Sequence, residues 1–310
     1  MFKRRVLVVS AGFLFAGLLG LGAYFLPVFQ AAGSSVRSGY MPELDPRQRS
    51  TAPFTVLLLG SDDDAKFPPE RLNTQSMILV RVDTVARQAT ILSIPRDLWV
   101  PIPNHGEGKI STAFQLGGPS GAIAAVESNF GVHVDYFVWI GLNGLVKLVD
   151  QLGGVNVIVT NPVLDDFYPS DLTPGGSPYE YYRVAVLPGA VRLDGVHALQ
   201  YVRSRHGDLR GDFARSERQQ QVLLAIKGQS SRLNVADLPA LASALNGELK
   251  TSMGPTRIRQ LLSVAGDFDG QSIHRIVLVD PYTSEGVIAG QYVLMPHWDM
   301  IRPLVRQSFP

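Results

Sequence analysis

The sequence Leu57-Leu58-Leu59-Gly60-Ser61-Asp62-Asp63-Asp64 joins an apolar run of strand length to a turn that carries three carboxylates. Further apolar runs of similar length follow along the chain. Several are nearly continuous in Val, Ile and Leu, as in strands that are covered on both faces. We therefore predict strands at residues 55–59, 77–82, 90–94, 136–140, 155–159 and 276–279.

Helical patterns lie between these runs, at residues 120–130, 142–152, 213–227, 237–245 and 256–265. Gly153-Gly154 is a stop signal for the second helix, and Asp212 is a suitable N-cap for the third. Strands that alternate with helices predict one α/β domain, built as a helix–sheet–helix sandwich. The segment 161–188 is predicted to be a long irregular loop. Its tyrosines either stack on sugar rings or cover the surface of a solvent-exposed insertion.

An uncharged stretch at positions 6–29 follows the basic residues Lys3, Arg4 and Arg5. As a helix it would be about 36 Å long, enough to cross a bilayer core of about 30 Å. The positive cluster predicts a cytoplasmic N-terminus, with the rest of the chain outside the cell. We expect an anchor at 1–30, a linker at 31–52 and an extracytoplasmic domain at 53–310. A cleaved signal peptide is the alternative, and it would export the same domain.

The composition excludes several classes of protein. Of the 310 residues, 45% are hydrophobic and 18% charged, which excludes intrinsic disorder. The absence of cysteine excludes disulfides, thiolate metal sites and a cysteine nucleophile. Without the three basic residues of the predicted anchor, 25 of the 28 Lys and Arg remain against 27 Asp and Glu, a net charge of −2. Nucleic acid is therefore not an expected partner.

The densest cluster of residues that could carry chemistry is the stretch 203–220. Its five arginines fall within 16 residues and are Arg203, Arg205, Arg210, Arg215 and Arg218. Arg215 lies in the first turn of the predicted helix, and Gln219 lies one turn later on the same face. A helix N-terminus with converging guanidinium groups suits an anion such as a diphosphate. The alternative is a solvated helix start whose arginines pair with neighbouring acids.

Two more groups follow predicted strands. The carboxylates at 62–64 come after the first strand, and Arg96 and Asp97 come after the third. Ligand sites of open α/β sheets lie beyond strand ends, and carboxylates there, beside a phosphate, suggest Mg²⁺. An acidic surface turn and a local ion pair are the alternatives.

In this order and spacing, these stretches resemble the LytR-CpsA-Psr family of bacterial cell-wall enzymes, from about residue 55 to 227 and more weakly to about 304. The matching stretches are 57–62, 77–83, 92–97, 108–110, 148–155, 193–203 and the arginine block to Gln220. The resemblance implies an α-β-α sandwich with a central mixed sheet. It also implies a membrane-anchored phosphotransferase, which moves a glycopolymer from a polyprenyl-pyrophosphate carrier to a peptidoglycan hydroxyl and releases polyprenyl phosphate.

The resemblance further implies roles for individual residues. The catalytic positions are Arg96, Arg203, Arg215 and Asp62. The substrate-binding positions are Arg205 and Gln219, with Asp212 ordering the arginine cluster and Arg218 and Lys109 as further candidates in the matching stretches. Mg²⁺, with Mn²⁺ as the alternative ion, is expected at Asp62 and Gln75. The implied partners are the lipid-linked glycan, peptidoglycan and the membrane. Asp97 and Asp212 are both candidates for the general base.

Three positions depart from the family pattern. Asp64 and Asn73 stand where the family usually has Arg, and Gln75 stands where it has a second carboxylate. In the other register, Asn73 takes the place of that carboxylate. An amide oxygen can ligate Mg²⁺ but contributes no charge. The alternative function is therefore a catalytically weak or inactive binder of polyprenyl-pyrophosphate lipids.

Overall fold

The computed structural model describes residues 52–61, 71–170, 177, 179–205, 211–230, 235–254, 257–258 and 272–310. The predicted anchor, almost all of the linker, the carboxylates at 62–64 and most of the predicted helix 256–265 lie outside these residues. Among the helices in the described residues, none has both the length and the hydropathy needed to cross a membrane.

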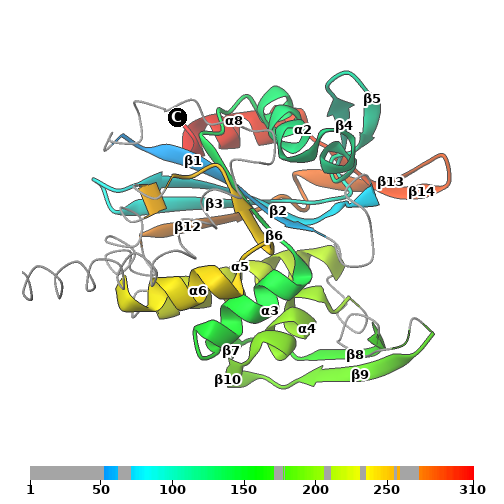
Figure 1. Cartoon of the computed structure of the whole chain (residues 1–310). Helices are drawn as coiled ribbons and strands as arrows, with labels where there is room; N and C mark the ends of the chain where they lie inside the picture. Colours follow the sequence, from blue (N-terminus) through cyan, green and yellow to red (C-terminus); the bar gives the residue numbers. More distant parts are fainter. Residues whose placement is uncertain are drawn as a thin grey trace, which may run out of the picture.

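A six-stranded mixed sheet forms the centre of the fold (Figure 1). β1 is parallel to β6 and β3 is parallel to β12, whereas β2 is antiparallel to both of its neighbours. This confirms the predicted mixed α/β fold. In spatial order the strands are β11 (Leu249–Thr251), β6 (Tyr136–Ile140), β1 (Phe54–Ser61), β2 (Thr74–Asp83), β3 (Gln88–Ile94) and β12 (Ile273–Val277).

The predicted strand at 155–159 exists but lies outside the central sheet. It is β7 (Val155–Val159), which pairs with β10 (Gly189–Leu193) in a separate two-stranded sheet. Asn156 and Ile158 of β7 are exposed between buried valines, because only one face of this small sheet packs on a core.

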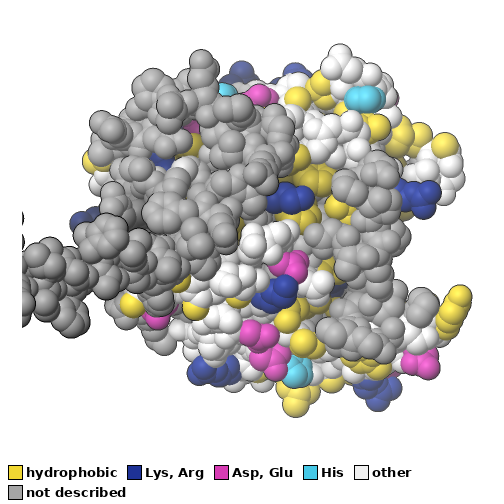
Figure 2. Space-filling model, in the orientation of Figure 1, with side chains coloured by type: hydrophobic (Ala, Val, Ile, Leu, Met, Phe, Trp, Pro, Cys, Tyr) yellow, Lys and Arg dark blue, Asp and Glu magenta, His cyan; other side chains and the backbone are white. Residues whose placement is uncertain are grey.

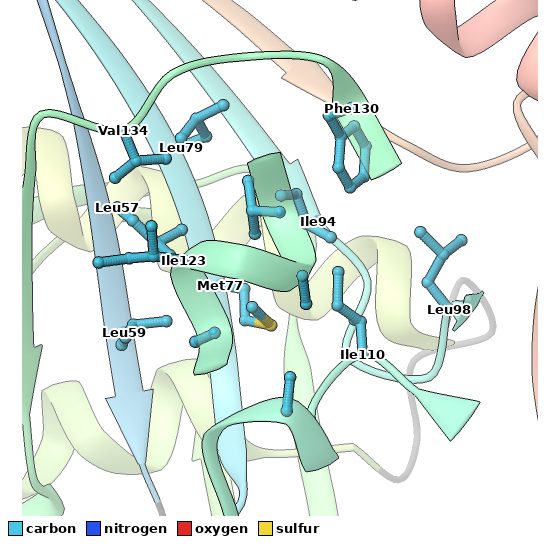
Figure 3. Close-up of a cluster of buried hydrophobic side chains, with 14 of the residues drawn as sticks. Leu57, Leu59, Met77, Leu79, Ile94, Leu98, Ile110, Ile123, Phe130 and Val134 are labelled. Carbon is cyan, nitrogen blue, oxygen red and sulfur yellow. The ribbon is translucent and has the colours of Figure 1, made fainter. Parts of the chain in front are cut away.

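One face of the central sheet is covered by α2 (Thr112–Phe130) and α8 (Trp298–Ser308), above the sheet in Figure 1. Buried leucines of β1 and β2 face Ile123 and Phe130 of α2 in one apolar cluster (Figure 3). Burial of each such side chain contributes about 1.5–3 kcal/mol. Only the second half of α2 was predicted, because Gly117 and Gly118 leave the helical conformation before Pro119 and kink the helix.

The other face carries α3 (Leu142–Gln151), α4 (Gly195–Arg203), α5 (Gly211–Ser230) and α6 (Leu238–Ala244), below the sheet in Figure 1. The predicted end of α3 is confirmed, since Gly153 and Gly154 have φ of +71° and +92°. α5 begins at Gly211, so Asp212 lies inside the helix. The prediction that Asp212 is its N-cap is therefore wrong.

The prediction of an irregular loop at 161–188 is wrong, because two strands form within this segment. β8 (Val163–Pro169) and β9 (Tyr181–Val186) form an antiparallel hairpin whose Val163, Val184 and Val186 are buried. Six further short strands were not predicted: β4 (Trp99–Ile102), β5 (Gly106–Lys109), β10 (Gly189–Leu193), β11 (Leu249–Thr251), β13 (Thr283–Ile288) and β14 (Gln291–Pro296). β4 pairs with β5 and β13 pairs with β14, and in each hairpin one strand lacks an apolar run, namely β5 (GEGK) and β13 (TSEGVI).

The crossing of α3 and α4 requires a glycine. A Cβ atom on Gly195 would lie 2.2 Å from the backbone oxygen of Val146, a contact that no rotamer change can relieve. We predict that Gly195→Ala lowers the free energy of unfolding by about 1–3 kcal/mol, the usual cost of overpacking. Urea denaturation measures the change. Gly228→Ala in α5 is the control, since its Cβ would meet nothing within 4 Å, and we expect it to stabilise by up to about 1 kcal/mol. Equal stabilities of the two variants would contradict the prediction.

Candidate functional site

The direction of the strands brings the predicted site residues to one edge of the sheet. β1 and β3 both run antiparallel to β2, so both end at the edge where β2 begins. Gln75 stands at the start of β2 and Arg96 follows β3, and Arg96 Nη1 donates a hydrogen bond to Gln75 Oε1. Asp62 directly follows the end of β1 but lies outside the described residues.

α5 supplies the other wall of the site. Arg215 and Gln219 line one cleft together with Gln75 and Arg96, so the two α5 residues share a face as their spacing predicts. Arg215 is only 6% exposed. Ser76 Oγ donates a hydrogen bond of 2.9 Å to Gln219 Oε1 and thereby joins this part of α5 to β2.

Gln220 and Ser93 fix α5 on the sheet, and the sequence analysis did not identify either of them. Gln220 Nε2 donates to Ser93 Oγ at 2.9 Å and to the backbone oxygen of Ile276 at 3.0 Å. A serine inside a buried apolar strand needs a hydrogen-bond partner, and that requirement was the available signal. These bonds set the position of α5, and therefore of the Arg215 guanidinium.

Asp97 lies behind Arg96 as the centre of a buried ion cluster. Asp97 Oδ1 accepts a hydrogen bond from Lys109 Nζ at 2.7 Å, and Asp97 Oδ2 accepts one from Arg96 Nε at 3.3 Å. Burial by itself raises the pKa of Asp97. The hydrogen bond from Lys109 and the charges of Arg96 and Arg205 outweigh that effect, so the pKa lies below its ordinary value of 3.8. A carboxylate held in its charged form by two cations is a poor general base, and it acts instead to orient Arg96 and Lys109.

The remaining predicted arginines take different positions. Arg203 ends α4, and its buried Nη1 has no hydrogen-bond partner in the described part of the chain. Arg205 donates its backbone N–H to Asp165 Oδ2 at 2.9 Å, and its side chain is exposed. Arg218 is not among the residues that line the cleft. It is 4% exposed, and its Nη2 donates to the backbone oxygen of Ser204 at 2.5 Å, which holds α5 against α4. The side chain of Asp212 is outside the part of the chain that the structure describes.

The described residues do not by themselves form a magnesium site. They contain no group of three His, Asp or Glu side chains close enough to hold a metal ion. Gln75 Oε1 accepts from a guanidinium, whose charge opposes a cation at the same place. Asn73 Oδ1 is buried and has no partner within the described ranges, but it is neutral. Asp62, the predicted charged ligand of Mg²⁺, lies outside the described residues, so the metal stays a prediction.

Chemically, the cleft has a cationic lining. Arg96 and Arg215 contribute two guanidinium groups to its lining, and Gln75 and Gln219 contribute neutral amides. Guanidinium groups bind phosphate oxygens in a planar, two-pronged geometry. A lining of this kind can bind an anionic phosphate group.

The ion cluster around Asp97 predicts a pH-dependent contribution to stability. Because its folded pKa is depressed, the contribution is complete above the unfolded pKa of about 3.9 and is lost as pH falls through the lower folded value. We expect Asp97→Asn to lower the free energy of unfolding by about 1.5–3 kcal/mol. The difference from wild type should be constant between about pH 5 and 8 and should shrink below about pH 4. Urea titrations across this range measure it, and a difference that grows on acidification would contradict the prediction.

Comparisons with known proteins agree with this geometry. The model of the LytR_cpsA_psr family matches residues 31–301. The polyisoprenyl-teichoic acid–peptidoglycan teichoic acid transferase TagU of Enterococcus faecalis is 33% identical over 65% of this chain and 62% of its own length. The transferase TagV of Bacillus subtilis, which carries the same description, is 29% identical over 71% of this chain and 55% of its own length. The match thus spans less than two thirds of either relative.

Solved structures show the same fold. The structure of TagT bound to LIIa-WTA is 26% identical, covers 87% of this chain and 95% of its own, and has a TM-score of 0.68. Because the family model covers most of the sequence and the fold agrees, the chain belongs to the LytR_cpsA_psr family.

Proposed function

We propose that the protein transfers a glycopolymer from a polyprenyl-pyrophosphate carrier to a hydroxyl of peptidoglycan. The observation that carries the proposal is the cleft in which Arg96 and Arg215 come together from β3 and α5. The descriptions of TagU and TagV as teichoic acid transferases support it. The predicted anchor at 6–29 would hold the domain at the outer face of the membrane, where the lipid carrier and the wall meet.

In the proposed reaction, the acceptor hydroxyl oxygen forms a bond to the phosphorus that carries the glycan. The bond from that phosphorus to the bridging oxygen breaks, and polyprenyl phosphate leaves with the electron pair. The proton of the acceptor hydroxyl passes to the released phosphate or to water. Arg96 and Arg215 bind the non-bridging oxygens and neutralise the charge on the leaving group. Gln75 and Asp97 hold the Arg96 guanidinium from two sides, so it is oriented before the substrate arrives.

Substitution of Arg96 tests the proposal. We expect Arg96→Ala to lower kcat/KM for release of polyprenyl phosphate from a lipid-linked glycan analogue by at least about 100-fold. Arg96→Lys should recover little, because an ammonium cannot donate two parallel hydrogen bonds. Arg302→Ala is the control, since Arg302 is an exposed residue of α8, on the opposite face of the sheet. Wild-type turnover by Arg96→Ala, with an unchanged melting temperature, would refute the proposed role.

A second candidate function is a binder of the same lipid without turnover. It is favoured by the neutral amide of Gln75, which accepts a hydrogen bond from Arg96 in the cleft. Turnover of the wild-type protein measured with Mg²⁺, with Mn²⁺ and with EDTA separates the two candidates. Turnover under any of these conditions supports the transferase, and tight binding with no turnover under all three supports the binder.

Gln75→Asp tests whether the metal lies beside this residue. A carboxylate at position 75 adds a charged oxygen ligand, so we expect the ratio of the rate with Mg²⁺ to the rate with EDTA to rise several-fold. Gln75→Asn is the matched control, because it has the length of Asp and the charge of Gln. Equal ratios in the two variants would place the metal elsewhere.

A further inference from the structure

The hairpin of β8 and β9 carries apolar side chains on its outward face. Phe167, Tyr181 and Leu164 are 60%, 62% and 49% exposed, and we refer to these three residues as the hairpin patch. Figure 2 shows hydrophobic side chains on the surface at the end of the hairpin, at the lower right. The opposite face supplies Val163 and Val184 to a second cluster of buried apolar residues, separate from the one under α2, so the outward side chains are not needed for packing.

The two aromatic rings of the patch are arranged as a pair. Their centroids are 6.4 Å apart and their planes meet at 74°, an edge-to-face contact. Asp166 and Arg183 form an ion pair on the same hairpin. Exposed apolar side chains rimmed by polar groups are typical of binding surfaces, and aromatic rings offer a large contact area with little conformational entropy to lose.

A β-bulge presents Phe167 and connects the patch to the arginine segment. The pairing of β8 and β9 changes register between Asp165 and Tyr168, where Phe167 turns outward. Asp165 Oδ1 accepts the backbone N–H of Phe167 at 3.0 Å, and Asp165 Oδ2 accepts that of Arg205 at 2.9 Å. One buried carboxylate therefore fixes the patch relative to Arg205, whose charge acts on Asp97 beside the cleft.

We infer that the hairpin patch binds the glycan strand of the peptidoglycan acceptor; this inference rests on the proposed function. The C–H faces of sugar rings pack on aromatic rings, whose faces carry the negative side of the ring quadrupole. Sugar hydroxyls can hydrogen-bond with Asp166 and Arg183. Through the Asp165 carboxylate, the hairpin is tied to the backbone of Arg205, one of the predicted substrate-binding arginines.

Charge favours a glycan over a lipid surface as the occupant. The exposed charged residues of the hairpin are Asp166, Glu180 and Arg183, a net charge of −1 in the described residues. Binding to an anionic bilayer relies on clusters of Lys and Arg, whereas a glycan strand with many hydroxyls does not require them.

Cosedimentation with polymer-free peptidoglycan sacculi, without lipid donor, tests the inference. The test variant is Phe167→Ser with Tyr181→Ser. The matched control is Val85→Ser with Val287→Ser, which removes two valines that are 71% and 73% exposed elsewhere on the surface. We expect the Kd for sacculi to rise at least about fivefold in the test variant and less than about twofold in the control. Equal Kd values for the test variant and wild type would overturn the inference.

Two further measurements identify other outcomes. Phe167→Leu with Tyr181→Leu keeps the apolar area but removes the rings, and it should lose sacculus binding like the serine variant. Retained binding would overturn stacking on sugars. Loss of binding to phosphatidylglycerol vesicles, with sacculus binding unchanged, would instead make the patch a membrane contact. The proposed function is tested separately by titrating wild type with the lipid-linked donor, so failure to bind the donor leaves the sacculus result interpretable.

Discussion

The antiparallel direction of β2 is the constraint on which the site depends. With β2 between β1 and β3, the ends of both outer strands fall at the edge where β2 starts. Gln75 and Arg96, which are 21 positions apart in the chain, become hydrogen-bond partners at that edge. The bonds from Gln219 and Gln220 to the sheet then place α5 across the same edge. Neither the strands nor the helix would form an anion site alone.

The ion cluster around Asp97 explains how the fold accommodates the neighbouring cations Arg96 and Lys109 at this edge of the sheet. Asp97 is 5% exposed, and burial of an unpaired carboxylate would be costly. Lys109 and Arg96 compensate that cost, and in return Asp97 fixes their side chains. The cluster still carries one positive charge more than it has negative charges, before Arg215 is counted. This excess of positive charge favours an anionic ligand at the edge that the cluster stabilises.

The sequence predicts the centre of this fold better than its periphery. β1, β2, β3 and β6 are recognisable because they are buried on both faces and read as apolar runs. β7 was also predicted from its valines, yet it pairs outside the central sheet and is buried on one face only, since hydropathy does not specify which strands pair. β8 and β9 were missed because Tyr, Asp and Pro interrupt their alternation, and because Asp165 occupies a buried position through its hydrogen bonds to backbone N–H groups.

The same distinction applies to the site. The i, i+4 spacing of Arg215 and Gln219 predicts a shared face, and the cleft contains both. Arg218 belongs to the same arginine block, but its guanidinium lies 5.9 Å from the centre of the Tyr201 ring and bonds the Ser204 backbone. Contacts between α4 and α5 decide whether an arginine of this block faces the cleft or the interior. Helix periodicity does not predict these contacts, because they arise only in the tertiary fold.

Gln75 shows how a neutral residue can change such a site without disrupting it. Its amide oxygen accepts the Arg96 hydrogen bond that a carboxylate could also accept, so the guanidinium remains oriented. An amide carries no charge, however, so among the described residues Arg96 is neutralised by Asp97 and not by Gln75. A carboxylate at this position would cancel part of the positive charge at this edge unless a cation were bound beside it. With Gln75 in this place, this edge of the sheet keeps more positive charge than it would with a carboxylate there.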